Sequence, residues 1–124
     1  LLHRRGWRQA VAKAPLRETL AAAMLLASRW DPRRPLVDPM CGSGTIPIEA
    51  ALIARRLAPG RHRAFAFERW PGHDADAWRA LLADADARAL PRAPHPILAS
   101  DRDAGAVRAA RANAERAGVA DDVT

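Results

Sequence analysis

Apolar positions along the chain alternate between helical spacing and short continuous runs. Residues 16–30 place apolar side chains at helical spacing, which predicts a helix with one buried face. The positions on that face are Leu16, Leu20, Met24, Ala27 and Trp30. Pro15 suits the first turn of this helix, and Asp31-Pro32 ends it.

Two short apolar runs, Leu36-Val37 and Ile97–Ala99, predict buried strands of a parallel sheet. A helix is expected after the first strand, where Thr45 can cap it and Ile48 and Leu52 lie on its buried side. This helix is expected to end before the sequence Ala-Pro-Gly at 58–60.

A further helix is expected after the second strand. Asp103 is a suitable N-cap, and Gly118 is a suitable terminating glycine. The buried positions between them are Val107, Ala110, Ala114 and Ala117. The last residues, 121–124, resemble the approach to a third strand.

Residues 60–96 carry a weaker pattern and are interpreted as an insertion. Phe65 and Phe67 fit either a short strand or an apolar plug, and residues 73–90 predict a helix capped by Asp74 or Asp76. The whole chain then reads as one partial α/β domain with right-handed crossovers between parallel strands. Its parts are the lead-in and first helix (1–33), the glycine loop and second helix (34–59), the insertion (60–96), and the second strand with its helix (97–124).

Composition narrows the functional classes. Lys and Arg number 20 against 14 Asp and Glu, a formal charge of +6, which suits a nucleic-acid partner but also fits a general bias toward arginine. One cysteine excludes an internal disulfide and suits a reducing cytoplasm. The four histidines lack zinc spacing, and we expect no metal and no membrane segment. The chain lacks an initial Met, so we expect a piece of a longer protein.

The arginine-rich start, residues 4–8, has no clear period. It could present Trp7 and its flanking arginines to RNA, with the indole stacked on a base. An ordinary solvated entry segment is the interpretation that we favour from these residues alone.

The chemistry is expected at the glycine loop, Asp38–Thr45, between the first strand and its helix. This order places free backbone N–H groups and a helix N-terminus at the carboxyl end of a strand. Pro47 occupies the third glycine site of a dinucleotide fingerprint, and no Gly-Lys-Ser/Thr follows as in a phosphate loop. Cys41 within the loop is interpreted as a small packing residue because no base for a thiolate nucleophile is evident.

The loop resembles motif I of class I S-adenosylmethionine-dependent methyltransferases, particularly those that methylate exocyclic nitrogens of bases. The segments around it extend that resemblance to the methyltransferase domain of the THUMP-associated RNA guanine-N2 methyltransferases, most closely the bacterial enzymes acting on large-subunit rRNA. They occur in order as residues 4–8, 14–21, 38–45, 49–54, 58–60, 65–70 and 100–103.

The resemblance implies a Rossmann-like parallel sheet, of which this chain is the N-terminal part only. It implies S-adenosylmethionine as cofactor, with Asp38 offsetting its positive charge, Asp101 accepting the ribose hydroxyls and Arg102 near the adenine. The other implied cofactor-binding residues are Thr19, Met40, Cys41, Gly42, Ser43, Gly44 and Thr45. Asp101 follows Gly44 by 57 positions (101 − 44) rather than the usual 20 or so, which the insertion accounts for.

Two family parts are absent from this sequence. The THUMP domain would precede Leu1, and the catalytic Asn/Asp-Pro-Pro-Tyr/Phe motif would follow Thr124. We therefore nominate no catalytic residue and expect this piece alone to be inactive. An adenine-N6 DNA methyltransferase, a tRNA guanine-N2 methyltransferase and a non-catalytic nucleic-acid-binding module remain alternatives. The joint presence of Gly42, Gly44 and Asp101 argues against the last of these.

Overall fold

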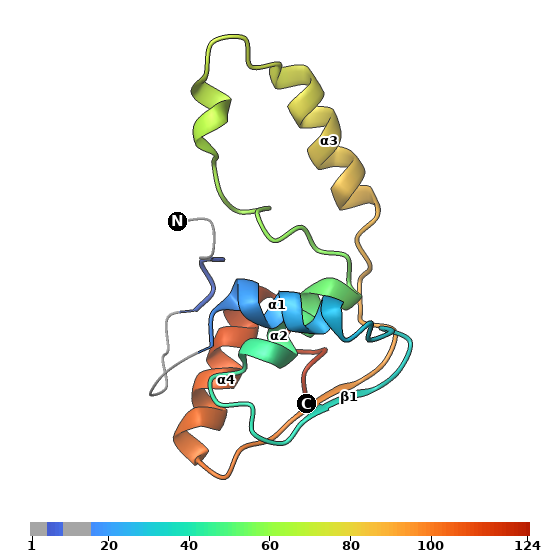
Figure 1. Ribbon diagram of the computed structural model, residues 1–124, viewed down its shortest axis with the longest axis vertical. Helices are drawn as coiled ribbons and strands as arrows, with labels where there is room; N and C mark the ends of the chain where they lie inside the picture. Colours follow the sequence, from blue (N-terminus) through green and yellow to red (C-terminus); the bar gives the residue numbers. More distant parts are fainter. Residues whose placement is uncertain (1–4, 9–15) are drawn as a thin grey trace.

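The structure is a computed structural model that describes residues 5–8 and 16–124. The predictions for Arg4 and Pro15 lie outside these residues. The described elements follow the predicted order (Figure 1). They are α1 (Glu18–Ala27), β1 (Leu36–Asp38), α2 (Thr45–Ala54), the 3₁₀ helix η1 (Ala66–Arg69), α3 (Ala75–Ala87), β2 (Ile97–Ala99) and α4 (Ala104–Ala117).

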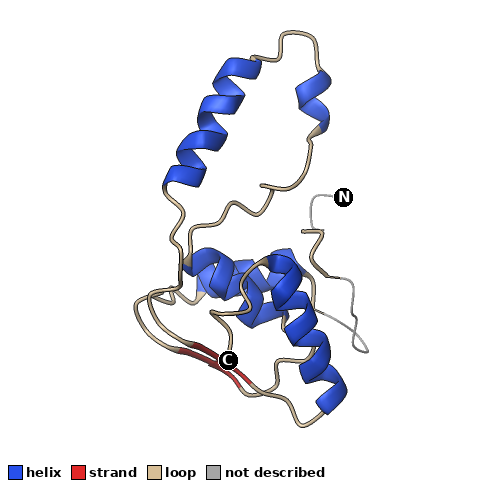
Figure 2. Ribbon diagram, turned by 180° about the vertical axis from the view of Figure 1, so that it is seen from behind, coloured by secondary structure: helices blue, strands red, loops and turns tan. Residues whose placement is uncertain are grey.

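The two strands form a parallel pair, in which Leu36 lies opposite Ile97 and Asp38 opposite Ala99. Val123 adds an isolated parallel bridge to Ile97, which agrees with a third strand beginning there. α2 packs against both strands and against α1 and α4, so these helices gather on one side of the pair (Figure 2). Val37 and Leu98, which pair across the strands, are exposed on the other side.

The core lies between this strand pair and α2. Ile48 and Ile97 are fully buried, and Leu52 is buried beside them, as the spacing predicted for α2. Alanines of α2 and α4 complete the contact, and their small side chains allow the helices to approach closely. α2 is therefore the element around which α1, α4 and the two strands pack.

The predicted apolar face of α1 is wrong. Leu20 and Met24 are about half exposed, at 51% and 49%, whereas Glu18, Ala21 and Leu25 are buried. The buried face is thus rotated from the one that the leucine spacing indicated. Packing against α2 and an ion pair made by Glu18 determine it, and hydrophobic periodicity cannot detect a buried carboxylate.

Three helix boundaries are confirmed and one cap is wrong. Asp74 accepts hydrogen bonds from the first turn of α3, Asp103 accepts one from Gly105, and Gly118 ends α4 in the left-handed conformation. Thr45 does not cap α2. Gly44 holds the N-cap position with φ 85°, and Thr45 is the first helical residue.

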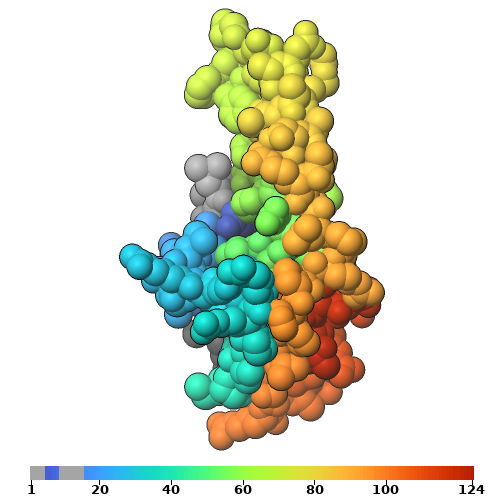
Figure 3. Space-filling model, turned by 90° about the vertical axis from the view of Figure 1, so that its right-hand side faces the viewer, coloured from blue at the N-terminus to red at the C-terminus, as the bar shows by residue number. Residues whose placement is uncertain are grey.

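Residues 60–96 form an arm that projects from the body (Figures 1 and 3). The described residues of the arm contain no strand, so that alternative for Phe65 and Phe67 is wrong. The two rings stack at 5.4 Å, and Trp78 of α3 meets both edge-on. They form a plug inside the arm, which explains how α3 is held although none of its residues is fully buried.

The described part of the arginine-rich start is a strap, residues 5–8, that lies against the body. Trp7 is only 6% exposed and belongs to the main core, so neither a solvated segment nor a base-stacking indole fits this position. Arg5 pairs with the buried Glu49 of α2 at 3.3 Å. We refer to residues 5–8 as the strap below.

None of the described helices is long and apolar enough to cross a membrane.

Candidate functional site

The candidate site lies where β1 and β2 end side by side. The Ser100 N–H donates to the Asp38 carbonyl, and the Cys41 N–H donates to the Ser100 carbonyl, both at 2.9 Å. These bonds continue the pairing of the strands into the loops that follow them. The glycine loop and the residues after β2 therefore lie together at the end of the molecule opposite the arm (Figure 3).

Both glycines of the loop adopt positive φ, 54° at Gly42 and 85° at Gly44. Residues other than glycine rarely adopt this backbone conformation. A Cβ on Gly44 would lie 3.0 Å from the Ala110 Cβ, so α4 also packs closely against this position. A Cβ on Gly42 would meet no atom within 4 Å. Gly42 thus leaves open space over the loop, as close approach by a ligand requires.

Asp101 connects the second strand to the glycine loop. Its Oδ2 accepts the Gly42 N–H at 2.9 Å, and its Oδ1 accepts the Asp103 N–H at 2.9 Å. The hydrogen bond from the Asp103 N–H, and to a smaller extent that from the Gly42 N–H, lowers the pKa of Asp101 below its usual value. The carboxylate is therefore ionised at neutral pH, and each oxygen retains a lone pair for a further donor.

Asp38 and Met40 begin the loop. The Asp38 Oδ1 accepts the Met40 N–H at 3.1 Å, which fixes the turn after β1. The Met40 side chain is 82% exposed. Arg102, next to Asp101, is exposed as well. Contacts of these three residues with a cofactor remain predictions.

Cys41 is buried, with 8% exposure. Burial raises the pKa of its thiol, and the nearby carboxylates of Asp38 and Asp101 raise it further. A raised pKa disfavours the thiolate, so the environment suits the packing role predicted from the sequence.

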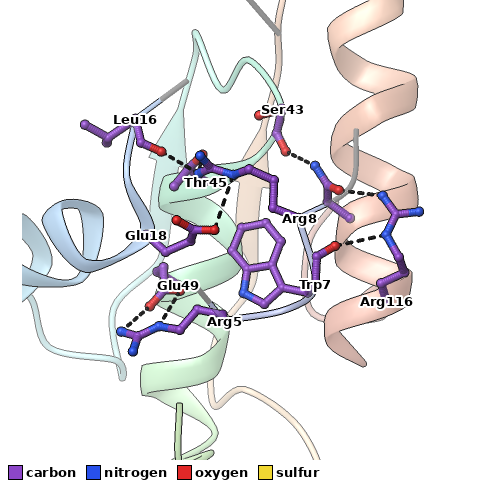
Figure 4. Close-up of polar contacts among 10 residues, drawn as sticks. Arg5, Trp7, Arg8, Leu16, Glu18, Ser43, Thr45, Glu49 and Arg116 are labelled. Carbon is purple, nitrogen blue, oxygen red and sulfur yellow. Dashed lines mark hydrogen bonds and ion pairs between the residues drawn. The ribbon is translucent and has the colours of Figure 1, made fainter. Parts of the chain in front are cut away.

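Thr19 and Thr45 lie in the first turns of two helices, α1 and α2. α1 begins at Glu18 without a side-chain cap from the described residues, and Thr19 in its first turn is exposed. Thr45 is buried, and its Oγ1 accepts a hydrogen bond from Arg8 at 2.6 Å. The start of α1 and the end of the glycine loop are therefore neighbours, as Figure 4 shows.

Sequence reasoning missed two polar residues that support the loop. Asn113 of α4 is fully buried and donates to the Ser43 carbonyl at 3.0 Å. Arg8 reaches Thr45 from the strap (Figure 4). A signal for Asn113 exists in the sequence, since this polar residue lies next to Ala114 on the predicted apolar side of its helix. The strap has no periodicity that could have indicated Arg8.

A cavity of about 340 Å³ adjoins the loop on the side of α4. Ala110 and Ala114 of α4 and Ala99 of β2 line it, together with residues at the end of the chain. Cys41 is the one predicted site residue in its lining. The space is thus next to the glycine loop and does not itself include the Gly42–Asp101 contact.

Among residues 5–8 and 16–124, no group of three or more His, Cys, Asp or Glu side chains could hold a metal ion.

Comparison with known proteins identifies relatives across nearly the whole chain. A family model described as the RMKL-like methyltransferase domain, UPF0020, matches residues 5–124. The chain is 49% identical over 126 aligned residues to the "Ribosomal RNA large subunit methyltransferase K/L" of Chromohalobacter salexigens, with 95% of this chain covered.

Two solved structures share the fold. One, SMU.472, is described as a candidate methyltransferase and was solved with SAH; it matches with a TM-score of 0.90 and 43% identity over 99% of this chain. The other, from Listeria monocytogenes, is described as an N6-adenine-specific DNA methylase by prediction; it matches with a TM-score of 0.84 and 44% identity over 99% of this chain. The chain spans 17% of the length of the Chromohalobacter protein and 32% of each solved chain. The class I methyltransferase fold predicted from the sequence is confirmed, and the chain corresponds to part of it.

Proposed function

The chain belongs to the RMKL-like methyltransferase domain family (UPF0020), and on this premise we propose that its protein transfers a methyl group from S-adenosylmethionine to RNA. The observation that carries the proposal is the hydrogen bond from the Gly42 N–H to the Asp101 carboxylate, at 2.9 Å. It joins the glycine loop of one strand to the acidic residue of the next, where a ligand with both a ribose and an amino-acid end can be held.

The residues present suit this cofactor. Open space over Gly42 allows a ligand to approach the backbone, and the spare lone pairs of Asp101 can accept two ribose hydroxyls. Asp38 supplies negative charge near a sulfonium, and the N–H groups of the loop can receive a carboxylate. When bound, the cofactor supplies an electrophilic methyl group. The part of this chain is to seat and orient that group, which contributes to the rate by positioning.

The substrate proposed is the N2 amino group of guanine in large-subunit rRNA. The printed name of the Chromohalobacter relative, which concerns rRNA, supports the RNA part of this proposal. The formal charge of +6 suits a polyanionic partner. The catalytic tetrapeptide expected for this chemistry does not occur in the sequence, so we place it elsewhere in the protein and propose that these 124 residues alone are inactive.

A second candidate is methylation of adenine N6 in DNA. The printed description of the Listeria structure favours it. The two candidates use the same cofactor seat and differ in the base that is presented to it.

One assay separates them. The full-length protein is incubated with methyl-labelled S-adenosylmethionine and, in parallel, with unmodified rRNA, tRNA and duplex DNA. The products are digested to nucleosides and identified by mass spectrometry. The proposal expects label in N2-methylguanosine from rRNA. Label in N6-methyldeoxyadenosine from DNA alone would replace it with the second candidate, and absence of transfer to every acceptor would favour a non-catalytic module.

A further inference from the structure

The strap is attached to the glycine loop by two separate polar connections (Figure 4). One leads from Arg8 directly to Thr45. The other leads from the Trp7 carbonyl, through Arg116 and Asn113 of α4, to the Ser43 carbonyl. Ser43 and Thr45 flank Gly44, so both connections end beside the left-handed glycine at which α2 begins.

The Arg8 connection also includes α1. The Nη2 of Arg8 donates to the Thr45 Oγ1 at 2.6 Å and to the carbonyl of Leu16, just before α1. Its Nε lies 3.6 Å from the Glu18 Oε1, in the first turn of α1. One guanidinium thus joins the entry of α1 to the end of the glycine loop.

The burial of these groups makes the arrangement specific. The side chains of Arg8 and Glu18 are 11% and 7% exposed. Two buried charges are expensive to desolvate and are tolerated when they are paired and hydrogen-bonded. A hydrophobic side chain could fill the same space, but it could not make the two hydrogen bonds, to the Leu16 carbonyl and the Thr45 hydroxyl, and the ion pair with Glu18. The planar guanidinium suits this task, and a lysine ammonium does not reproduce it.

We propose that Arg8 is a positioning residue for the cofactor site. It holds the first turn of α1 and the N–H groups of the glycine loop at the separation that the cofactor requires. The inference rests on the proposed cofactor seat and adds a residue outside the motif that defines it. Arg8 itself contacts no reacting atom.

The strap contains a matched control. Arg5 also makes a buried ion pair, with Glu49 at 3.3 Å, and its side chain is 15% exposed. Glu49 lies in the second turn of α2, away from the loop itself. Arg5→Lys and Arg8→Lys therefore each replace a guanidinium in the same segment, but only Arg8→Lys removes a direct side-chain contact with the glycine loop.

The test measures the dissociation constant of SAH by titration calorimetry with the full-length protein, together with the unfolding temperature. We expect Arg8→Lys to weaken SAH binding about tenfold, which corresponds to about 1.4 kcal/mol. Arg5→Lys is expected to lower the unfolding temperature comparably and to change the affinity less than about twofold. Hydrogen exchange provides a second measurement, because the amides of residues 41–45 should exchange faster in Arg8→Lys than in Arg5→Lys.

Thr45→Val provides an independent variant if Arg8→Lys folds poorly. It removes the hydroxyl acceptor but leaves Arg8 beside Glu18. It should also weaken SAH binding. Because Thr45 is itself a predicted cofactor-binding residue, the double variant is decisive: it should be little weaker than Arg8→Lys if the Arg8–Thr45 hydrogen bond positions the loop, and fully additive losses would contradict the inference.

Unchanged affinity in Arg8→Lys, or equal losses of affinity in Arg8→Lys and Arg5→Lys, would overturn the inference and leave the cofactor seat intact. Failure of the wild-type protein to bind SAH at all would instead overturn the proposed function, and this inference with it.

Discussion

Replacing Gly44 by alanine tests the geometry of the glycine loop most sharply. The substitution places a Cβ on a residue with φ 85°, which costs about 1–2 kcal/mol for any side chain. That Cβ would lie 3.0 Å from the Ala110 Cβ, 3.1 Å from the Ile48 Cδ1 and 3.2 Å from the Ala110 Cα. The Ile48 methyl can rotate away, but the backbone of α4 cannot. Overpacking of this kind adds about 1–3 kcal/mol.

Gly42→Ala is the matched comparison. Gly42 also has a positive φ, 54°, but its added Cβ would meet no atom within 4 Å. It therefore has only the conformational cost of about 1–2 kcal/mol. The entropy that alanine removes from the unfolded chain is common to both variants and cancels in the comparison. We expect Gly44→Ala to destabilise the domain by about 1–3 kcal/mol more than Gly42→Ala.

Hydrogen exchange followed by mass spectrometry on the full-length protein gives the opening free energies of α2 and α4, where the difference should appear. Equal destabilisation by the two variants would refute the close contact between Gly44 and α4. The same two variants also test the proposed binding of SAH at the glycine loop. Gly42→Ala should weaken SAH binding although its Cβ meets no atom in the free protein, because that Cβ would enter the space that we propose for the cofactor.

Two further predictions concern titrating groups. The thiol of Cys41 is buried and has a raised pKa, so at neutral pH iodoacetamide should label it more slowly than an exposed cysteine in the unfolded protein; equal labelling rates by mass spectrometry would contradict this. Burial raises the pKa of Glu49 above 4.5 more than its pairing with Arg5 lowers it. The folded state therefore holds this proton to higher pH than the unfolded state. The stability of the wild type relative to Glu49→Gln should be greatest below pH 4.5 and decline as pH rises through the folded pKa. Thermal unfolding of both proteins across this range measures the decline, and a difference independent of pH would count against it.

The local signals of the sequence were sufficient for the α/β alternation and for several helix ends. Asp103 and Gly118 bound α4 because side-chain capping and left-handed glycine are local properties. Ile48 and Leu52 of α2 were predicted to be buried from their helical spacing, and both are buried. The helix is buried on most of its other positions as well, including Glu49, which the spacing did not indicate. Features that depend on neighbouring residues alone could therefore be predicted from the sequence.

Predictions that depended on contacts between distant segments were less successful. The buried face of α1 was wrong because Arg8, ten positions earlier, pairs with Glu18 and brings a charged residue into the interior. Thr45 was assigned as a cap, whereas its hydroxyl accepts from the same arginine. The strap has no period, and its burial depends on Glu18, Glu49 and Arg116, which only the folded chain places around it.

The candidate site was predicted in part from the sequence. Its residues follow from motif and order along the chain, and the structure places Gly42 and Asp101 in contact across 59 positions. Their proposed roles toward the cofactor remain predictions, since hydrogen bonds within the protein do not identify the ligand.

The central claim is that Asp101 and the glycine loop form the seat for S-adenosylmethionine. Its most direct test is the affinity of the full-length protein for SAH, measured by calorimetry, in the wild type and in Asp101→Ala. Two hydrogen bonds to a charged acceptor, at about 1.5 kcal/mol or more each, would account for a loss of about 100-fold. Asp103→Ala is the control, because it removes the cap of α4 and should cost about 1 kcal/mol of stability with little change in affinity. Unchanged SAH affinity in Asp101→Ala would contradict the account.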